Sequence, residues 1–193
     1  MLQILILACA ATTQLLTNQT AKEMRILTTC LLSLCFYVAA AQSKQDSIRT
    51  IEETLVKRSA AAFANYQYDE QFNLVSDDVT LVLTDLSKIE NKQGYKDIIK
   101  RIGETQKGRG ITRSIQFRYH KFIINSDLTY AEGIFKISLT NPAEASPRTQ
   151  YSAFTHIYRL ENGQWKVLMD SHTTNPGLTE GDFLKAKAIY ELK

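Results

Sequence analysis

Residues 154–172 of this chain, FTHIYRLENGQWKVLMDSH, contain two runs of alternating apolar and polar side chains on either side of Glu161-Asn162-Gly163. An Asn-Gly pair between two such runs is typical of a tight β-hairpin turn. The sequence therefore predicts an antiparallel hairpin with strands over 149–160 and 164–173. Side chains two positions apart on a strand point to the same face, so Asp170 and His172 are expected side by side.

Two more strands are expected before this hairpin. Residues 112–124 and 128–139 are rich in β-branched and aromatic side chains, and Asn125-Ser126-Asp127 between them predicts a turn. The alternation of the first run slips by one position, which predicts a β-bulge near His120 or Lys121. A bend in the second strand is expected at Gly133. The second half of the chain is thus predicted to be a meander of long, bent strands.

Helices are expected before the meander. Apolar side chains recur every three or four positions over 43–66, which predicts an amphipathic helix with Ser43 and Asp46 in a capping box. The elements expected to follow are a helix over 69–75, a turn at 76–78, a strand over 79–83, a loop with a second short strand over 85–94, a helix over 94–105 and, after the meander, a helical tail over 178–193. This order indicates the α+β class, with the N-terminal helices packed against one curved antiparallel sheet.

The first 41 residues differ in composition from the rest of the chain. Lys22 and Arg25 precede an apolar run over 26–38, and Ala39-Ala40-Ala41 follows that run. This order is typical of a secretory signal peptide cleaved after Ala41, with Met24 as the expected true start. An uncleaved anchor is the alternative, although the run is shorter than the ~20 residues of a membrane-spanning helix. We expect an exported protein, periplasmic or secreted, with a leader over 1–41, a domain over 42–177, and no attachment to the membrane after cleavage.

Composition excludes several classes of site. The 193 residues carry a formal net charge of +3, and charges of both signs are interspersed along the chain. This pattern favours neither nucleic acid nor an anionic membrane as a partner. All three cysteines lie in the leader, at positions 9, 30 and 35. After cleavage the domain would have no disulfide scaffold, thiolate metal site or cysteine nucleophile.

Three segments resemble the nuclear transport factor 2-like superfamily, in particular its SnoaL-like branch. They are FNLVSDDVT at 72–80, QGYKDII at 93–99, and the hairpin at 154–172 with its Tyr-Arg-x-x-Asn-Gly-x-Trp-Lys pattern. The resemblance covers residues 46–174. It implies a cystatin-like roll, in which a cone-shaped curved sheet wraps around the helices and a pocket opens between them. Members include isomerases, dehydratases, cyclases, and proteins that only bind or dimerise, so function has to be inferred from the pocket.

Four side chains are candidates for acid–base chemistry: Asp170, Glu132, His156 and His172. A carboxylate beside an imidazole can act as an acid–base pair on an enolisable carbonyl. Related domains often have Asp-His-x-Ser here, whereas Ser171 occupies the position of their histidine. The alternatives are a solvent-exposed strand end for Asp170 and His172, and a core position for His156. Glu132 would be a buried base on a concave face and an ordinary exposed charge on a convex one.

Tyrosine suits the lining of a pocket, because its ring is apolar and its tip is polar. The expected lining is Tyr66, Tyr95, Tyr119, Tyr130 and His156, although tyrosines also fill ordinary cores and dimer faces. The three histidines have no metal-ligand spacing, and the sequence has no phosphate-binding loop, dinucleotide fingerprint or hydrolase elbow. We therefore expect neither a metal nor a cofactor.

These observations leave three hypotheses. The first is an exported domain that binds a hydrophobic or amphipathic small molecule in its cone pocket without catalysis and, by resemblance, forms a homodimer. The second is an isomerase, dehydratase or cyclase that uses a pocket Asp or Glu with His. The third is a structural or dimerisation module whose pocket is filled by its own side chains. An enzyme with Asp170 or Glu132 as base would be favoured if two among Glu132, His156 and Asp170 converged on an open apolar cavity, and it would fail if they lay outside it. A closed pocket would favour the dimerisation module.

Overall fold

The computed structural model describes residues 44–174 and 177–192. The expected leader over 1–41, the start at Met24 and the capping residue Ser43 lie outside the described residues. In the part of the chain that is described, no helix is long and apolar enough to cross a membrane.

The predicted first helix is present and contains one π turn. The chain is helical from residue 44 to residue 64; its middle is the π turn η1 (Glu52–Val56) and its end is α2 (Lys57–Ala64). One face is buried in the core through Ile48, Ile51 and Leu55. The opposite face is polar, and Lys57 contacts both Glu53 at 2.6 Å and Glu52 at 3.3 Å.

Two further helices follow the order that the sequence predicts. The short α3 (Tyr68–Asn73) comes directly after the first helix. The longer α4 (Lys92–Gly108) begins at Asn91, whose side chain accepts hydrogen bonds from the backbone N–H groups of Gln93 and Gly94 at 3.0 and 3.1 Å. This N-cap satisfies two donors that a helix start leaves without partners.

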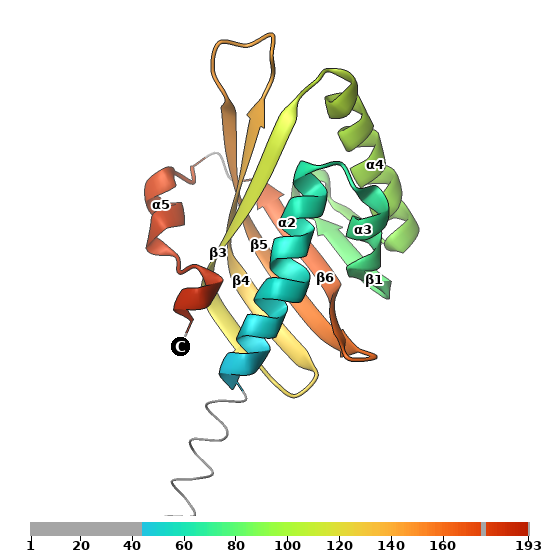
Figure 1. The fold of residues 1–193 in the computed structure, drawn as a ribbon, viewed down its shortest axis with the longest axis vertical. Coiled ribbons are helices and arrows are strands. Elements are labelled where there is room, and N and C mark those ends of the chain that lie inside the picture. The colour runs from blue at the N-terminus through green and yellow to red at the C-terminus, as the bar shows by residue number, and fades with distance from the viewer. Residues whose placement is uncertain (1–43, 175–176, 193) are drawn as a thin grey trace, which may run out of the picture. The chain divides into compact units, whose positions relative to one another are not determined.

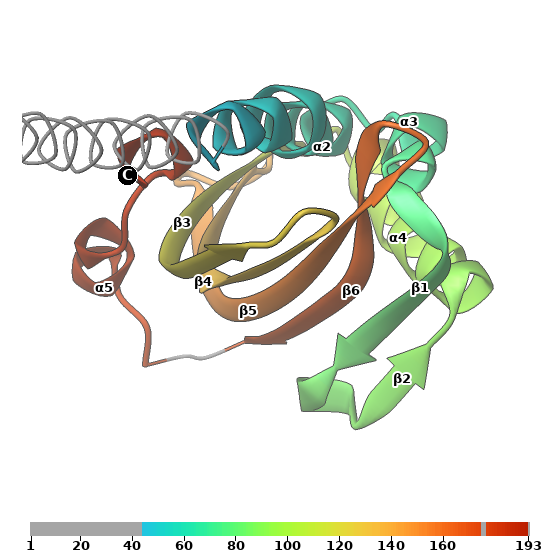
Figure 2. The same cartoon turned by 90° about the horizontal axis from the view of Figure 1, so that it is seen from below.

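One six-stranded sheet has the strand order β2-β1-β6-β5-β4-β3. Its strands are β1 (Val75–Leu83), β2 (Lys88–Glu90), β3 (Thr112–Ile124), β4 (Leu128–Thr140), β5 (Arg148–Glu161) and β6 (Gln164–Thr174). The elements are shown in Figure 1. Figure 2 shows the sheet curving around a concave side, with the first helix across it.

The prediction of a purely antiparallel sheet needs one correction. β3 to β6 form the expected antiparallel meander, but β1 pairs with β6 in parallel, so the sheet is mixed. The chain leaves β1 through β2 and α4 before the meander begins, so β1 is not a hairpin neighbour of β6. The alternation of apolar and polar side chains shows which face of a strand is buried. It does not show whether a partner strand far away in the sequence runs parallel or antiparallel to it.

The predicted turn at residues 76–78 is wrong, because these residues extend β1. Ser76 is fully buried and donates to Glu161. Arg159 binds Asp78 at 2.5 Å through its Nη2, and it also contacts Glu161 at 2.6 Å. These contacts attach the start of β1 to the β5–β6 hairpin, and they compensate for the low strand propensity of aspartate.

The predicted bulge and bend are both confirmed, and they lie opposite each other. The β3–β4 register shifts between Tyr119 and Lys121, which leaves His120 as the extra residue. Tyr119 pairs with Gly133, where an added Cβ would come within 1.9 Å of the Arg118 carbonyl oxygen. Glycine therefore permits the close backbone approach that the bulge creates.

The C-terminal tail consists of two short helices and not the single helix that its pattern predicts. They are α5 (Glu180–Lys185) and the 3-10 turn η3 (Ile189–Glu191). Between them, Lys187 exchanges two backbone hydrogen bonds with Tyr119, of 2.7 and 2.9 Å. The tail thus covers part of β3, which is an edge strand of the sheet.

Candidate functional site

The concave face of the sheet carries a small group of titratable side chains, which we call the histidine–aspartate cluster: His156, Asp170 and His172. His156 lies on β5 directly opposite Asp170 on β6, and Phe154 lies opposite His172. Phe154 and Tyr158, which share the parity of His156, belong to the main buried core. The cluster therefore faces the interior between the sheet and the first helix.

A second bulge, absent from the sequence prediction, brings this cluster together. Tyr158 pairs with Val167, but Ile157 pairs with Met169, so Leu168 is an extra residue in β6. Without it, regular pairing from the hairpin turn would place Met169 opposite His156, and Asp170 would point to the other face. Because a slip of one position reverses every side chain beyond it, the bulge turns Asp170 and His172 to the concave side.

The cluster is linked by hydrogen bonds on one carboxylate oxygen. His156 Nε2 and His172 Nδ1 both lie 3.2 Å from Asp170 Oδ1, and His156 Nδ1 lies 3.0 Å from the Tyr158 hydroxyl. An ionised carboxylate only accepts, so each histidine donates to it from the nitrogen that faces it. In neutral His156, Nδ1 then accepts from Tyr158. In neutral His172, Nε2 is the basic nitrogen.

The ionised form of Asp170 and the protonated form of His172 stabilise each other. Burial alone would raise the pKa of Asp170, but the two histidines hold it well below its ordinary value of 3.8. Burial likewise acts to lower the pKa of His172, and the hydrogen bond to Asp170 outweighs it and raises that pKa above 6.5. Asp170 is therefore a stable anion, and it favours a proton on His172.

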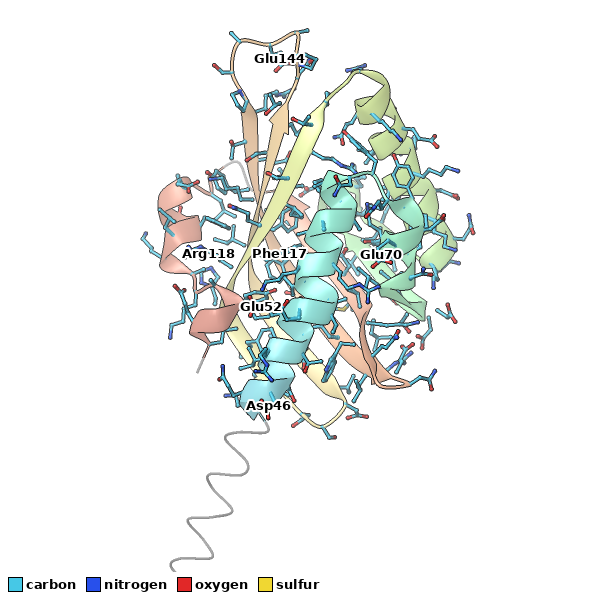
Figure 3. The ribbon with its side chains drawn as sticks, viewed as in Figure 1. Asp46, Glu52, Glu70, Phe117, Arg118 and Glu144 are labelled. Carbon is cyan, nitrogen blue, oxygen red and sulfur yellow. The ribbon has the colours of Figure 1, made fainter. Side chains whose placement is uncertain are left out.

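Exposure distinguishes the two histidines. The side chain of His156 is 9% exposed, that of Asp170 is 16% exposed and that of His172 is 27% exposed. His156 is enclosed by aromatic rings, with centroid distances of 4.4 Å to Phe154 and 6.0 Å to Phe117, which is labelled in Figure 3. His172 packs against one edge of Phe135, at 5.6 Å. Among the three members of the cluster, His172 is the one most accessible to another molecule.

Two of the tyrosines expected in the pocket lie near this cluster. Tyr95 lies on α4, and its pKa is raised by burial and, to a smaller extent, by the negative charge of Asp170. Tyr119 is fully buried, and its ring packs edge-on against Phe154 at 5.6 Å. Tyr119 therefore fills the interior of the cone more than it lines an opening.

The other candidates lie elsewhere. Ala131 and Phe135 of β4 belong to the core, so Tyr130 and Glu132, which have the opposite parity, lie on the outer face. There the Tyr130 hydroxyl donates to Glu132 at 2.9 Å. Tyr66 follows the first helix, and its hydroxyl donates to the carbonyl oxygen of Ile111 at 2.6 Å. The structure thus brings together Asp170, His156 and His172, and leaves Tyr130 and Tyr66 apart from them. Glu132 shares with the cluster only the lining of one cavity, through His172.

Two cavities in the described part of the chain lie near candidate residues, and neither is lined by His156 or Asp170, so the convergence of two candidates on an open cavity is not observed there. The larger, about 760 Å³, is bounded by the first helix, α3 and α4. The smaller, about 270 Å³, includes Glu132, Thr155, Ser171 and His172 in its lining, with Leu178 of the tail. Within the described ranges, no group of three or more His, Cys, Asp or Glu side chains is arranged to hold a metal ion.

Comparison with known proteins identifies the fold. No protein-family model matches the chain, and no curated protein matches it. A solved NTF2-like protein with a cystatin-like fold from Novosphingobium aromaticivorans is similar to it, with a TM-score of 0.60 and 11% identity over 75% of this chain and 92% of that one. This chain has the NTF2-like, cystatin-like fold.

Two other solved structures agree with this fold. A conserved protein from Planctomyces limnophilus has a TM-score of 0.55 and 16% identity, over 69% of this chain and 99% of its own. A protein of unknown function with a cystatin-like fold from Nostoc punctiforme has a TM-score of 0.50 and 15% identity, over 67% and 91% of the two chains. At these identities the comparisons show that the NTF2-like fold is shared. They do not show that the chemistry is shared. The SnoaL-like branch remains a prediction.

Two residues of interest in this NTF2-like fold, Tyr158 and Arg113, are not among the candidates that the sequence indicates. Tyr158 is two positions from His156 on the same strand, so its parity alone was enough to place it in the same group. Arg113 is buried at the start of β3, and it lies on the same parity as Ile115, Phe117 and Tyr119. The slipped alternation drew attention to the bulge, and the charged residue at the start of the strand was assigned no role.

Proposed function

We propose that this domain is a proton-transfer enzyme of the isomerase, dehydratase or cyclase type, with His172, which lines the smaller cavity, as the base in place of Asp170 or Glu132. The observation that supports it is the hydrogen bond between His172 Nδ1 and Asp170 Oδ1, since it leaves Nε2 as the basic nitrogen of neutral His172. A carboxylate that orients an imidazole and stabilises its protonated form is the arrangement that general base catalysis requires.

The surroundings of the cluster suggest the kind of substrate. Phe117, Phe135 and Phe154 surround the histidines with apolar ring surface. We infer that a small carbonyl compound would lie in the 270 Å³ cavity lined by Phe154 and His172, with its acidic C–H near Nε2 of His172. Proton abstraction would give an enolate and an imidazolium; the imidazolium would then be stabilised by Asp170, and proton return to a different atom would complete an isomerisation.

A test of this proposal is deuterium exchange at carbon in D₂O, followed by proton NMR. Cyclohexanone, acetophenone and 1-phenylpropan-2-one are suitable probes, because each has exchangeable protons next to its carbonyl. We expect the wild-type protein to accelerate exchange of at least one probe, and His172→Gln and Asp170→Asn to reduce the acceleration ~100-fold or more. Asp127→Asn removes an exposed carboxylate in the turn between β3 and β4, outside both cavities, and should leave the rate unchanged.

The proposal fails if all three probes exchange at the buffer rate, or if His172→Gln is as active as the wild type. A second candidate function is binding of a small molecule without catalysis. It is favoured by the 270 Å³ cavity, because of the three members of the cluster only His172 lines it. In that case the probes would shift the NMR signals of the His172 ring while their C–H exchange remained at the buffer rate.

We also propose that the protein is exported and works as a homodimer. Export is supported by the order of charge, apolar run and small residues over 22–41. N-terminal sequencing of protein purified from its own source should begin at Gln42, and a start well before Gln42 would contradict export. Native mass spectrometry of the same sample should give twice the mass of the cleaved chain.

A further inference from the structure

The two edges of the sheet differ in what covers them. The β3 edge is covered by the C-terminal tail, through the two backbone hydrogen bonds between Tyr119 and Lys187. The β2 edge pairs with β1 on one side only, and within the described residues the backbone of Lys88, Ile89 and Glu90 has no hydrogen bond to any other element. Free N–H and C=O groups on an edge strand are a template for another strand. The β2 edge is therefore the open one.

Exposed apolar side chains lie along this open edge. Ile89, in the centre of β2, is 74% exposed, and Leu86, in the turn before it, is 64% exposed. These are the highest values among the large apolar side chains of the described residues. In Figure 2 the β1–β2 hairpin projects at the end of the sheet opposite to α5. Two neighbouring apolar side chains next to free backbone groups indicate a contact surface.

The hairpin that carries this edge is fixed to the rest of the sheet. Asp85, in its turn, accepts a hydrogen bond from the backbone N–H of Thr174 at 2.6 Å, which attaches the turn to the end of β6. Ser87 adopts the left-handed region with a φ of 50°, and its N–H donates to the Thr84 carbonyl oxygen at 3.1 Å. Directly after β2, Asn91 caps α4. A strand that is fixed in advance loses little conformational entropy when it binds a partner.

The sequence of β2 is complementary to a second copy of itself. If two β2 strands run antiparallel with Ile89 opposite Ile89, Lys88 of each copy lies opposite Glu90 of the other. Opposite charges in directly opposed positions stabilise a pair of strands. A pairing centred on Lys88 would oppose two lysines, and one centred on Glu90 would oppose two glutamates. Charge therefore selects the register centred on Ile89.

The same charges act against other strands. Lysine on an edge strand commonly prevents pairing with other chains, and Lys88 would do so against a strand that has no acidic residue in the opposed position. A second copy supplies Glu90 there. Within one strand Lys88 and Glu90 lie 3.6 Å apart, with side chains 57% and 29% exposed, so both remain accessible from the edge. The edge is thus selective for its own copy.

We propose that two copies of this chain pair through their β2 strands, antiparallel and with the two Ile89 residues opposite each other. The two six-stranded sheets then form one continuous sheet across a two-fold axis. Ile89 and Leu86 of each copy are covered by the contact. This inference rests on the proposed homodimer, to which it assigns a surface, and it does not rest on the proton-transfer proposal.

A cysteine at the centre of the pair tests the register directly. Opposed residues of antiparallel strands have Cα atoms about 4.5 to 5.5 Å apart, which is within the range of a disulfide. The background is the full chain with serine in place of its cysteines at positions 9, 30 and 35. Under mild oxidation Ile89→Cys should form a disulfide-linked dimer on a non-reducing gel. Ile123→Cys, at an exposed position near the end of β3, is the control and should remain unlinked.

Charge reversal tests the two contacts between Lys88 and Glu90. Lys88→Glu and Glu90→Lys should each weaken the dimer about 30-fold in sedimentation velocity, because two attractive pairs become two like-charged pairs. An equimolar mixture of the two variants should dimerise again, since each glutamate of one variant then lies opposite a lysine of the other. Lys107→Glu reverses an exposed charge on α4 and should dimerise as the wild type does.

The outcomes separate this interface from the homodimer as such. If the wild type is a dimer that neither charge reversal weakens, or if Ile123→Cys becomes linked and Ile89→Cys does not, the β2 interface is overturned and the homodimer stands. A wild type that is monomeric at every concentration contradicts the homodimer and this interface together. Proton transfer is tested independently, through exchange at carbon and the variants of His172.

Discussion

His156 and Asp170 lie directly opposite each other on neighbouring antiparallel strands, with 3.2 Å between His156 Nε2 and Asp170 Oδ1. This pairing exists only because β6 contains the extra residue Leu168 between Val167 and Met169. One inserted position therefore directs a carboxylate into an aromatic interior, where it has two histidine partners. A bulge of this kind is a common means of aiming a side chain at a site.

Asp170→Asn should destabilise the fold, because it leaves the two histidines without the anion they share. We expect a loss of about 3 kcal/mol in the free energy of unfolding, as for removal of one partner from a buried ion pair. Urea denaturation at pH 6 measures it. Asp127→Asn, in the exposed turn between β3 and β4, is the matched control and should change stability by less than about 0.5 kcal/mol. A loss no larger than that of the control would contradict the burial and pairing described for Asp170.

The stability of the domain should fall on acidification through Asp170. Its pKa in the folded protein is below the ordinary value of 3.8, so its contribution is present above that value and is lost as the pH falls through the folded pKa. Urea midpoints measured from pH 6 to pH 2 should decrease, and they should decrease less in Asp170→Asn. Parallel curves for the two proteins would show that other carboxylates cause the loss.

His172 should produce a second loss of stability, on the alkaline side. Its folded pKa is raised above 6.5, so its contribution is fully present below pH 6.5 and is lost as the pH rises through the folded value. An NMR titration of the His172 ring should therefore give a midpoint above 6.5, and Asp170→Asn should lower that midpoint. A midpoint at or below 6.5 in the wild type would contradict the hydrogen bond to Asp170.

Gly133→Ala should be among the most damaging substitutions in the sheet. Its Cβ would come within 1.9 Å of the Arg118 carbonyl oxygen, and a backbone atom has little freedom to move away. We expect a loss of about 3 kcal/mol in unfolding free energy from the resulting overpacking. Gly108→Ala, which meets nothing within 4 Å in the last turn of α4, should be neutral or stabilise by about 0.5 kcal/mol.

Most of the fold could be predicted from the sequence because its signals are local. The four strands of the meander were placed within two residues at each end, since alternation and turn residues mark them, and the slipped alternation near His120 located the first bulge. The parallel pairing of β1 with β6 could not be predicted, because it depends on where α4 returns the chain. The apparent turn at 76–78 is a strand because Arg159, distant in the sequence, binds it.

The candidate site was predicted less completely, for a similar reason. The two-residue spacing of Asp170 and His172 correctly placed them on one face, but which face depends on the second bulge. Leu168 lies in an apolar run that gives no sign of a slip, unlike the run around His120. That single extra residue decides whether His156 pairs with Asp170 or with Met169. The members of the cluster could therefore be predicted from the sequence, but the contact between them could not.

The C-terminal tail should protect the β3 edge from association with other chains. Phe183 is buried, Arg118 donates to the Ala186 carbonyl oxygen at 3.0 Å, and Lys187 pairs with Tyr119. A protein truncated after Thr174 would expose these backbone groups on an edge strand, which favours pairing between molecules. Light scattering and size-exclusion chromatography should therefore show concentration-dependent aggregation of the truncated protein.

A point variant distinguishes loss of edge protection from loss of core packing. Lys187→Pro removes the backbone N–H that donates to the Tyr119 carbonyl oxygen at 2.9 Å, while it leaves Phe183 and Ile189 in place. It should aggregate more than the wild type and less than the truncated protein, with nearly unchanged urea stability. Lys187→Ala removes the same side chain but keeps the backbone N–H, so it is the control and should stay soluble. If Lys187→Pro also stays fully soluble and the truncated protein is merely less stable, the tail acts through packing and not as a cover for the edge.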